Sequence, residues 1–176
     1  MSKKSSPQDL LAAVKEAHRL QLQDILETLS AQVEALAPSD FEKLVLKVLK
    51  RLENVPFGRV TQYSRDGGID GYVSEDAAGR RRVPFQAKRV KATIGGPVVQ
   101  QFCGAMTDVG AENGVFVTTS VFSPDAKRCD FVKKGKLVLI DGALLAEWMY
   151  FFDIGVLTES PITLKILAPH GFHLDG

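Results

Sequence analysis

Asp66-Gly67-Gly68-Ile69-Asp70-Gly71 and Phe85-Gln86-Ala87-Lys88-Arg89 decide the fold of this chain, because both lie in segments with the pattern of short strands. Side chains two positions apart on a strand point to the same face. Gln86 and Lys88 therefore project together, and Ala87 points away. An amide oxygen beside a lysine, with a carboxylate such as Asp70 from the neighbouring strand, forms a compact site for a hard divalent cation and an activated water. The two stretches predict a hydrolytic metal site on paired strands.

Helix and strand patterns alternate on both sides of these stretches. The patterns predict helices at 39–53, 97–110, from 123 onward and at 142–152, and strands at 59–64, 69–74, 82–88, 115–119 and 137–140. A turn-rich connection joins the second and third strands as a hairpin, and the later strands follow helices. This order predicts an α/β fold in which helices sandwich a mixed central sheet.

Capping residues predict where several helices begin. Ser39 is an expected N-cap, with Glu42 three residues later in capping-box register. Ser123 is expected to cap a helix that has Pro124 at its first position. Asp141-Gly142 is expected to be a turn and helix entry.

Residues 7–37 have the pattern of one amphipathic helix, which precedes the sandwich. The positions that recur at three- and four-residue steps are Leu11, Val14, His18, Leu22, Ile25, Leu29 and Val33. This apolar stripe is expected to pack against the domain itself, against another copy of the chain or against a domain outside it. The alternating run 162–167 predicts an edge strand in the tail. We therefore expect an N-terminal helical extension (1–37), a central α/β domain (38–157) and a C-terminal tail (158–176).

The composition excludes several classes of protein. Lys and Arg number 22 against 21 Asp and Glu, so any binding of nucleic acid must depend on local basic patches. Cys103 and Cys129 lie outside any zinc-ligand spacing and fit a reduced, cytoplasmic setting. No segment has the length and apolarity of a membrane helix, and residues 1–7 lack the apolar core of a signal peptide. We expect a cytoplasmic protein with no membrane partner.

The motifs together resemble the Mrr-type restriction endonuclease catalytic domain, which belongs to the PD-(D/E)xK nuclease superfamily and carries Gln where most relatives carry Asp or Glu. The resemblance runs in the same order over residues 38–157 and implies the restriction-endonuclease-like α/β/α sandwich. Its segments are the opening helix (39–45), the Asp-bearing strand (66–71), the Gln-x-Lys strand (86–89) and the later strands (114–120 and 139–142).

Each candidate site residue has a chemical role and a simpler structural alternative. Asp70 is the best metal ligand, although an Asp among glycines also forms turns, which is the role expected for Asp66. Gln86 offers an amide oxygen, or is merely a polar strand position. Lys88 can orient the attacking water and stabilise the phosphate, or is an exposed strand lysine. The resemblance implies Mg²⁺ (or Mn²⁺) as cofactor and adds two ligands: the backbone carbonyl of Ala87, and Glu42, directly or through water. Glu42 could instead only cap its helix.

A basic run surrounds the candidate site and is expected to contact the DNA backbone. Its members are Arg80, Arg81, Arg82, Arg89 and Lys91, besides Lys88. Cations near a metal site attract phosphate, with counterion release supplying affinity for any sequence. The alternative is a solvated charged face.

The leading functional hypothesis is a Mg²⁺-dependent endodeoxyribonuclease acting on double-stranded DNA. The resemblance implies restriction of foreign or methylated DNA, as in type IV restriction enzymes. Family members usually carry a separate N-terminal DNA-reading domain, so a further domain or subunit is an expected partner, and a homodimer would supply two sites for a double-strand break. The alternatives are a non-cleaving DNA-binding or assembly module and a junction-resolving or repair nuclease.

Overall fold

The computed structural model describes residues 7–61, 68–74, 76–79 and 82–158. Contacts divide the chain into two units, Met1–Ile25 with Leu157–Gly176, and Leu26–Val156. The second unit holds the sheet and every candidate site residue that is described. The expected tail strand 162–167 lies outside the described residues.

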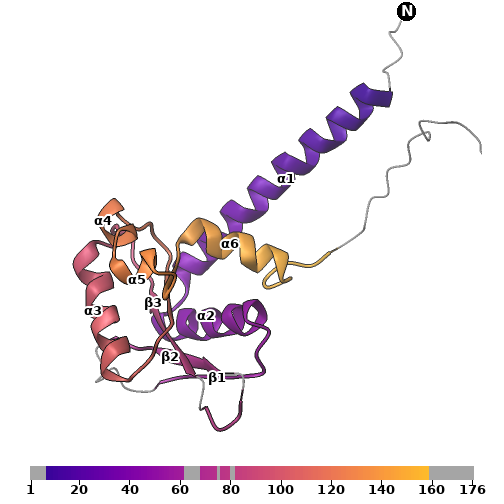
Figure 1. Ribbon diagram of the computed structural model, residues 1–176. Coiled ribbons are helices and arrows are strands. Elements are labelled where there is room, and N and C mark those ends of the chain that lie inside the picture. The colour runs from indigo at the N-terminus through magenta and orange to yellow at the C-terminus, as the bar shows by residue number, and fades with distance from the viewer. Residues whose placement is uncertain (1–6, 62–67, 75, 80–81, 159–176) are drawn as a thin grey trace, which may run out of the picture. The chain divides into compact units, whose positions relative to one another are not determined.

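The helices follow the predicted order (Figure 1). Their bounds are α1 Pro7–Ala35, α2 Pro38–Leu52, α3 Gly96–Asp108, α4 Pro124–Lys127, α5 Asp130–Lys133 and α6 Gly142–Phe151. The helix expected from residue 123 is interrupted, because α4 ends after four residues and α5 begins only at Asp130.

Five strands of the described chain form one mixed sheet in the order β1-β2-β3-β4-β5. Their bounds are β1 Phe57–Val60, β2 Gly71–Ser74, β3 Arg82–Lys88, β4 Gly114–Thr118 and β5 Leu137–Ile140. The first three strands pair antiparallel, whereas β3, β4 and β5 pair parallel. The hairpin followed by strand–helix–strand units therefore produces the mixed sheet that the sequence predicts.

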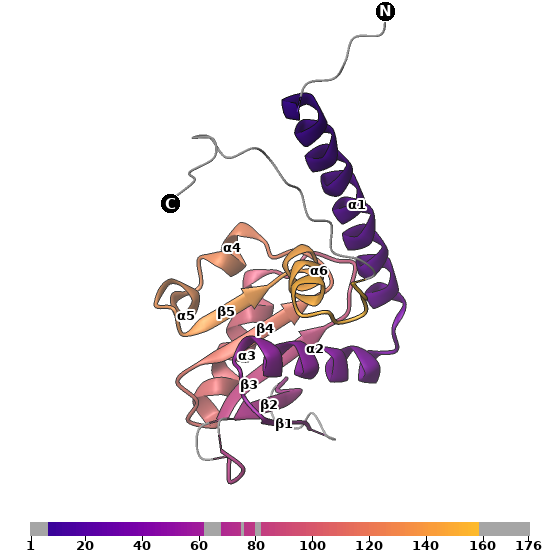
Figure 2. The same ribbon diagram turned by 90° about the vertical axis from the view of Figure 1, so that its right-hand side faces the viewer.

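Helices cover both faces of this sheet, with α3 on one face and α2 and α6 on the other (Figures 1 and 2). On the α3 face, Phe116 makes edge-to-face contacts with Phe102 and Phe122, at centroid distances of 5.6 and 5.5 Å. The buried face of α2 presents Phe41, Val45, Val48 and Leu49, of which the most exposed is 1% accessible. Burial of such side chains contributes about 1.5–3 kcal/mol each and fixes α2 on the sheet. The α/β/α sandwich of the sequence analysis is confirmed.

The start of α2 differs from the prediction. Its N-cap is Ala37, with Pro38 in the first turn and no side-chain cap hydrogen bond, so the capping box of Ser39 and Glu42 is wrong. Proline at the first helical position needs no hydrogen-bond donor and already has a helical φ, which moves the helix start ahead of Ser39. Glu42 therefore does not cap this helix.

The other two predicted helix starts are confirmed. Ser123 accepts a hydrogen bond from the backbone N–H of Ala126 at 3.2 Å, with a proline following it. Asp141 accepts one from the N–H of Leu144 at 3.0 Å. Both are local signals, since the cap and its donor are three residues apart.

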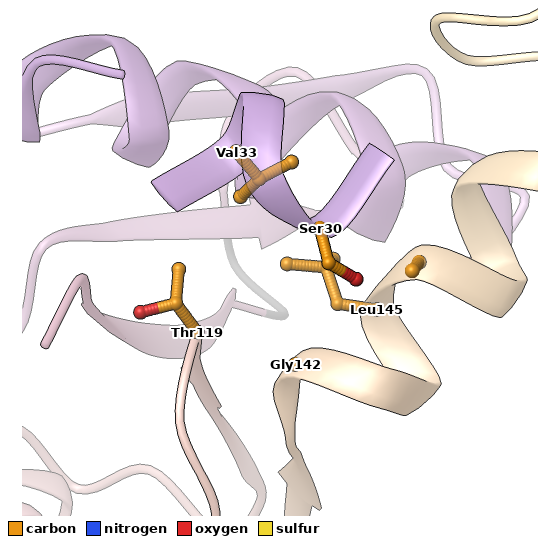
Figure 3. A pocket seen from close by; sticks show the side chains of 6 residues that line it. Ser30, Val33, Thr119, Gly142 and Leu145 are labelled. Carbon is orange, nitrogen blue, oxygen red and sulfur yellow. The ribbon is translucent and has the colours of Figure 1, made fainter. Parts of the chain in front are cut away.

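A small cavity lies where the end of α1 meets the end of β4 and the start of α6. Figure 3 shows Ser30 and Val33 of α1 facing Thr119 and Leu145 across it, with Gly142 at the border. Its volume of about 10 Å³ admits at most one water molecule. This cavity belongs to the packing of the fold and is too small for a substrate.

None of the described helices has the length and apolarity needed to cross a membrane.

Candidate active site

Asp70 lies just ahead of β2 and takes a place beside the end of β3. Its backbone N–H donates to the carbonyl of Phe85 at 2.9 Å, although the strand register pairs Phe85 with Gly71. Its carboxylate Oδ2 then accepts the backbone N–H of Ala87 at 2.7 Å. The Asp70 carboxylate therefore accepts a bond that a backbone carbonyl of a longer neighbouring strand would otherwise accept. This contact with Ala87 fixes the position of the side chain beside β3.

The Gln86 side chain is buried in the middle of the site. Gln86 is 8% exposed, and its Oε1 atom has no hydrogen-bond partner among the described residues. Gly68, with φ +104°, lies against the amide: a Cβ built on it would be 2.6 Å from Nε2 of Gln86. A buried amide oxygen without a partner is costly in a native protein and calls for a ligand or a solvent molecule.

Ala87 and Lys88 complete the end of β3. Backbone groups of a strand alternate between its two edges. The carbonyl of Lys88 accepts Thr119 N–H on the β4 edge, so the N–H and carbonyl of Ala87 both face the Asp70 edge. Lys88 is half-buried, and its charge lies close enough to Asp70 to lower the pKa of that carboxyl.

Glu42 comes to the site from α2, which covers the face of the sheet opposite α3 (Figures 1 and 2). It is half-buried, and its pKa is raised by burial and then by the charge of Asp70, whereas Lys43 lowers it. The pKa of Asp70 is also raised, chiefly by burial, against the lowering effects of the Ala87 hydrogen bond and of Lys88. Two acids with raised pKa values in electrostatic contact are a frequent property of functional sites.

These residues fit a hard divalent cation. The donors are carboxylate, amide and carbonyl oxygens, which Mg²⁺ prefers. A cation would satisfy the buried Gln86 oxygen and offset the unfavourable proximity of Asp70 to Glu42. Within the described ranges no three His, Cys, Asp or Glu residues cluster as a metal site. The candidate donors include only two acids, Asp70 and Glu42, beside an amide and a backbone carbonyl.

Three hydroxyl residues at the end of β4 hold the site segment and were missed by the sequence analysis. Thr118 Oγ1 donates to the carbonyl of Lys88 at 2.8 Å, and Thr119 Oγ1 donates to that of Val90 at 2.9 Å. Ser120 Oγ donates to the carbonyl of Lys91 at 3.1 Å. Hydroxyl residues at the end of a buried apolar strand were the available signal, but their partners are about thirty residues away in sequence.

The described members of the basic run lie toward the two ends of β3. Arg82 is at the start of the strand, where its Nε donates to Gly79 at 2.6 Å and its guanidinium lies 5.6 Å from the Tyr72 ring centroid. Lys88 ends the strand about 20 Å away, because a strand rises about 3.3 Å per residue. Arg89 is exposed and donates to the carbonyl of Glu34 at 3.0 Å.

The remaining members of the basic run are placed as follows. Lys91 is exposed in the segment that Ser120 holds. Arg80 and Arg81 lie outside the described residues, as does Asp66.

An α/β/α sandwich is typical of the restriction-endonuclease-like class of proteins when Gln and Lys stand at the end of its central strand and an Asp ahead of the neighbouring strand lies beside them. The chain belongs to the restriction endonuclease family of the Mrr catalytic domain, whose family model matches residues 33–149.

A curated relative gives the family context. The chain is 40% identical over 159 residues to the type IV methyl-directed restriction enzyme EcoKMrr of Escherichia coli (strain K12), covering 87% of this chain and 50% of that protein. The chain thus spans half the length of this relative.

Two solved structures are similar to this fold. The DNA modification-dependent restriction endonuclease AspBHI matches 77% of this chain and 36% of its own, with a TM-score of 0.56 and 20% identity. The MspJI restriction endonuclease in complex with a 27-mer oligonucleotide matches 85% of this chain and 34% of its own, with a TM-score of 0.46 and 22% identity. The AspBHI match confirms the fold class.

Proposed function

We propose that this chain is a metal-dependent endodeoxyribonuclease that hydrolyses phosphodiester bonds of double-stranded DNA. The buried Oε1 atom of Gln86 carries the proposal, because it has no described hydrogen-bond partner and is next along β3 to the Ala87 N–H that binds Asp70. Membership of a restriction endonuclease family gives the same reaction class.

Asp70, Gln86 and the Ala87 carbonyl are the proposed ligands of Mg²⁺ (or Mn²⁺), with Glu42 bound directly or through water. When bound, the ion supplies polarisation of the scissile phosphate and a lower pKa for an attacking water. Asp70 and Glu42 contribute the negative charge of the ligand set. Gln86 contributes a neutral oxygen, so the affinity is weaker than a carboxylate at that position would give.

Lys88 is the proposed catalytic cation. Its ammonium shares a face of β3 with Gln86 and acts on the charge of Asp70, which places a positive charge beside the proposed metal ligands. There it can orient the attacking water and stabilise the negative charge that builds on the phosphate in the transition state. The hydroxyls of Thr118 and Thr119 keep its segment in place.

The proposed substrate is foreign or methylated DNA. A methyl group in the major groove can be recognised by apolar contact. The relative named as methyl-directed is twice as long as the matched region, so we place site choice in a further domain or subunit. Restriction of incoming DNA would take place in the cytoplasm, where Cys103 and Cys129 stay as free thiols.

The basic run and α1 have proposed roles around this reaction. Arg82, Arg89 and Lys91, together with Arg80 and Arg81, would contact the DNA backbone and add affinity for any sequence. One site cuts one strand, so a homodimer would supply the two sites of a double-strand break. The N-terminal part of α1 is the proposed dimer contact, since Leu10 and Leu20 are 61% and 53% exposed there.

Plasmid cleavage in Mg²⁺ tests the proposal. Asp70→Ala and Lys88→Ala are expected to lower the cleavage rate at least about a hundredfold while the chain stays folded. Lys134→Ala, an exposed lysine far along the chain, is the matched control. Methylated, unmethylated and branched DNA as separate substrates distinguish restriction from junction resolution. Cleavage by Lys88→Ala at the wild-type rate, with contamination excluded, would refute the site, and binding without cleavage would favour the non-cleaving module.

A further inference from the structure

The exposed side of α2 forms a cationic groove that the proposed reaction does not use. The groove has a volume of about 400 Å³, and four of its seven lining residues are cationic while none is acidic. The lining residues are Lys43, Leu46, Lys47, Lys50, Arg51, Val55 and Pro56. We refer to it as the α2 groove.

The helical repeat explains how the cations come to share one side. Lys43, Lys47, Lys50 and Arg51 follow at steps of four, three and one residues, which places them on one stripe of a helix. The opposite side of α2 is buried against the sheet. The cations therefore stand on a rigid element, and Val55 and Pro56, in the segment that leads into β1, complete the lining of the groove.

Most of this charge lacks a partner. Lys43 pairs with Asp40 at 2.9 Å in an exposed ion pair. Within the described part of the chain, Lys47, Lys50 and Arg51 form no ion pair. Three neighbouring cations repel one another, and an anion in the groove would relieve that repulsion.

The length of the stripe indicates an extended anion and not a single phosphate. From Lys43 to Arg51 the helix rises about 12 Å, at about 1.5 Å per residue. Nucleotides of one DNA strand follow each other at about 3.4 Å along the helix axis, so the stripe is long enough to contact more than one phosphate of a strand. A concave lining also fits a strand better than a flat anionic membrane.

The groove begins next to the candidate active site. Glu42 and Lys43 are adjacent on α2, and Lys43 acts on the charge of Glu42. The stripe then leads away from Glu42 toward the start of β1, and α2 lies along the sheet (Figure 2). One helix thus carries a proposed metal ligand at its beginning and a row of cations along its length.

We propose that the α2 groove binds the phosphodiester backbone of duplex DNA next to the scissile phosphate, an inference that rests on the proposed nuclease function. The basic run at β3 and the α2 groove are then separate backbone contacts. A strand held by α2 is positioned relative to Glu42 by the helix itself, independently of the base sequence.

Fluorescence anisotropy of a labelled duplex, with Ca²⁺ in place of Mg²⁺ and at several KCl concentrations, tests this contact. The full chain is compared with a triple variant, Lys47→Ala, Lys50→Ala and Arg51→Ala. Lys43 is kept because it lies beside Glu42. A matched triple variant removes three exposed lysines elsewhere: Lys133→Ala, Lys134→Ala and Lys136→Ala.

The α2 variant is expected to bind at least about tenfold more weakly at 0.1 M KCl, with the slope of log K against log salt reduced by about 2 to 3, or about 0.9 per lost phosphate contact. The matched variant should keep the wild-type slope. Equal slopes for all three proteins would overturn the α2 contact, as would binding of the wild type to anionic lipid vesicles in preference to the duplex.

Lysine acetylation of the wild-type chain gives a second measurement that needs no variant. Duplex DNA is expected to protect Lys47 and Lys50 and to leave Lys133 and Lys134 reactive; equal reactivity with and without DNA would count against the groove.

Plasmid cleavage keeps the two proposals distinguishable. A wild-type chain that cuts DNA while the α2 variant binds normally would overturn only the groove, whereas a chain that binds through α2 and never cuts would overturn the nuclease.

Discussion

The Asp70 carboxylate accepts the backbone N–H of Ala87 at 2.7 Å, although Asp70 precedes β2 and Ala87 lies seventeen residues later in β3. This bond lowers the pKa of Asp70, and burial raises it by more, so the net effect is a raised pKa. The folded chain therefore keeps a carboxylate in an unfavourable place at neutral pH. Such a cost is typical of residues held for function.

Asp70→Asn is expected to raise the melting temperature in EDTA at pH 7.5. In the folded chain the pKa of Asp70 is raised above its ordinary value of 3.8. The wild type therefore loses stability as the pH rises from 3.8 to the folded-state pKa, and it loses no more above that pKa. Asn keeps the hydrogen-bond acceptor but has no charge. The gain should shrink as the pH falls toward 3.8. Thermal unfolding at several pH values measures this, and a lower melting temperature at pH 7.5 would contradict it.

Gln86→Glu is expected to tighten Mg²⁺ binding on the order of tenfold, because a charged oxygen replaces a neutral one in the ligand set. Calorimetric titration of the DNA-free protein measures the affinity. Gln32→Glu adds the same charge at an exposed position of α1 and should leave the affinity unchanged. An unaltered dissociation constant in Gln86→Glu would remove Gln86 from the metal site. Turnover can still fall, since a third carboxylate shifts the position of the metal.

Gly68→Ala is expected to displace the Gln86 amide, since the new Cβ would lie 2.6 Å from its Nε2 atom. We expect weaker Mg²⁺ binding and a loss of about 1–3 kcal/mol of stability. Gly110→Ala is the matched control, because Gly110 also has a positive φ of 68° and nothing within 4 Å of the added Cβ. It should lose only the backbone cost of about 1 kcal/mol and keep its metal affinity. Equal effects of the two variants would show that backbone strain alone is responsible.

Cys103 is expected to resist alkylation in the folded chain. Its thiol is buried and lies 3.6 Å from the Sγ of Cys129, and burial followed by this contact raises its pKa to about 12. At pH 8 roughly one molecule in ten thousand would carry the thiolate. Mass spectrometry after iodoacetamide treatment should find Cys103 modified only in urea. Labelling of Cys103 at the same rate in the folded and unfolded chain would refute this.

A chain beginning at Leu26 is expected to be monomeric, whereas the full chain should sediment as a dimer. The cut is placed there because Leu29 and Val33, at 2% and 4% exposure, are part of the core of the second unit. A start at Pro38 would remove both and lower stability by an estimated 2–5 kcal/mol per large apolar side chain. Sedimentation velocity measures the oligomeric state of both chains. Two monomeric species would refute the proposed dimer contact.

Local signals in the sequence were sufficient for much of this fold. The strands 82–88 and 137–140 were predicted with the bounds that β3 and β5 have. Ser123 and Asp141 were predicted as helix starts, because a cap and its donor are only three residues apart. The failed cap at Ser39 shows the limit of such signals, since the preceding proline competes for the same helix start.

The sequence by itself determined the α/β/α class and the residue types of the candidate site, because strand alternation and motif order are properties of neighbouring residues. Only the tertiary structure decided how the site is held together. The register of β2 on β3 brings Asp70 to Ala87, seventeen residues away, and the turn ahead of it sets Gly68 against Gln86. The parallel pairing of β3 with β4 brings the Thr118 hydroxyl to Lys88, thirty residues away. Such contacts depend on the register of the strands, which no local pattern contains.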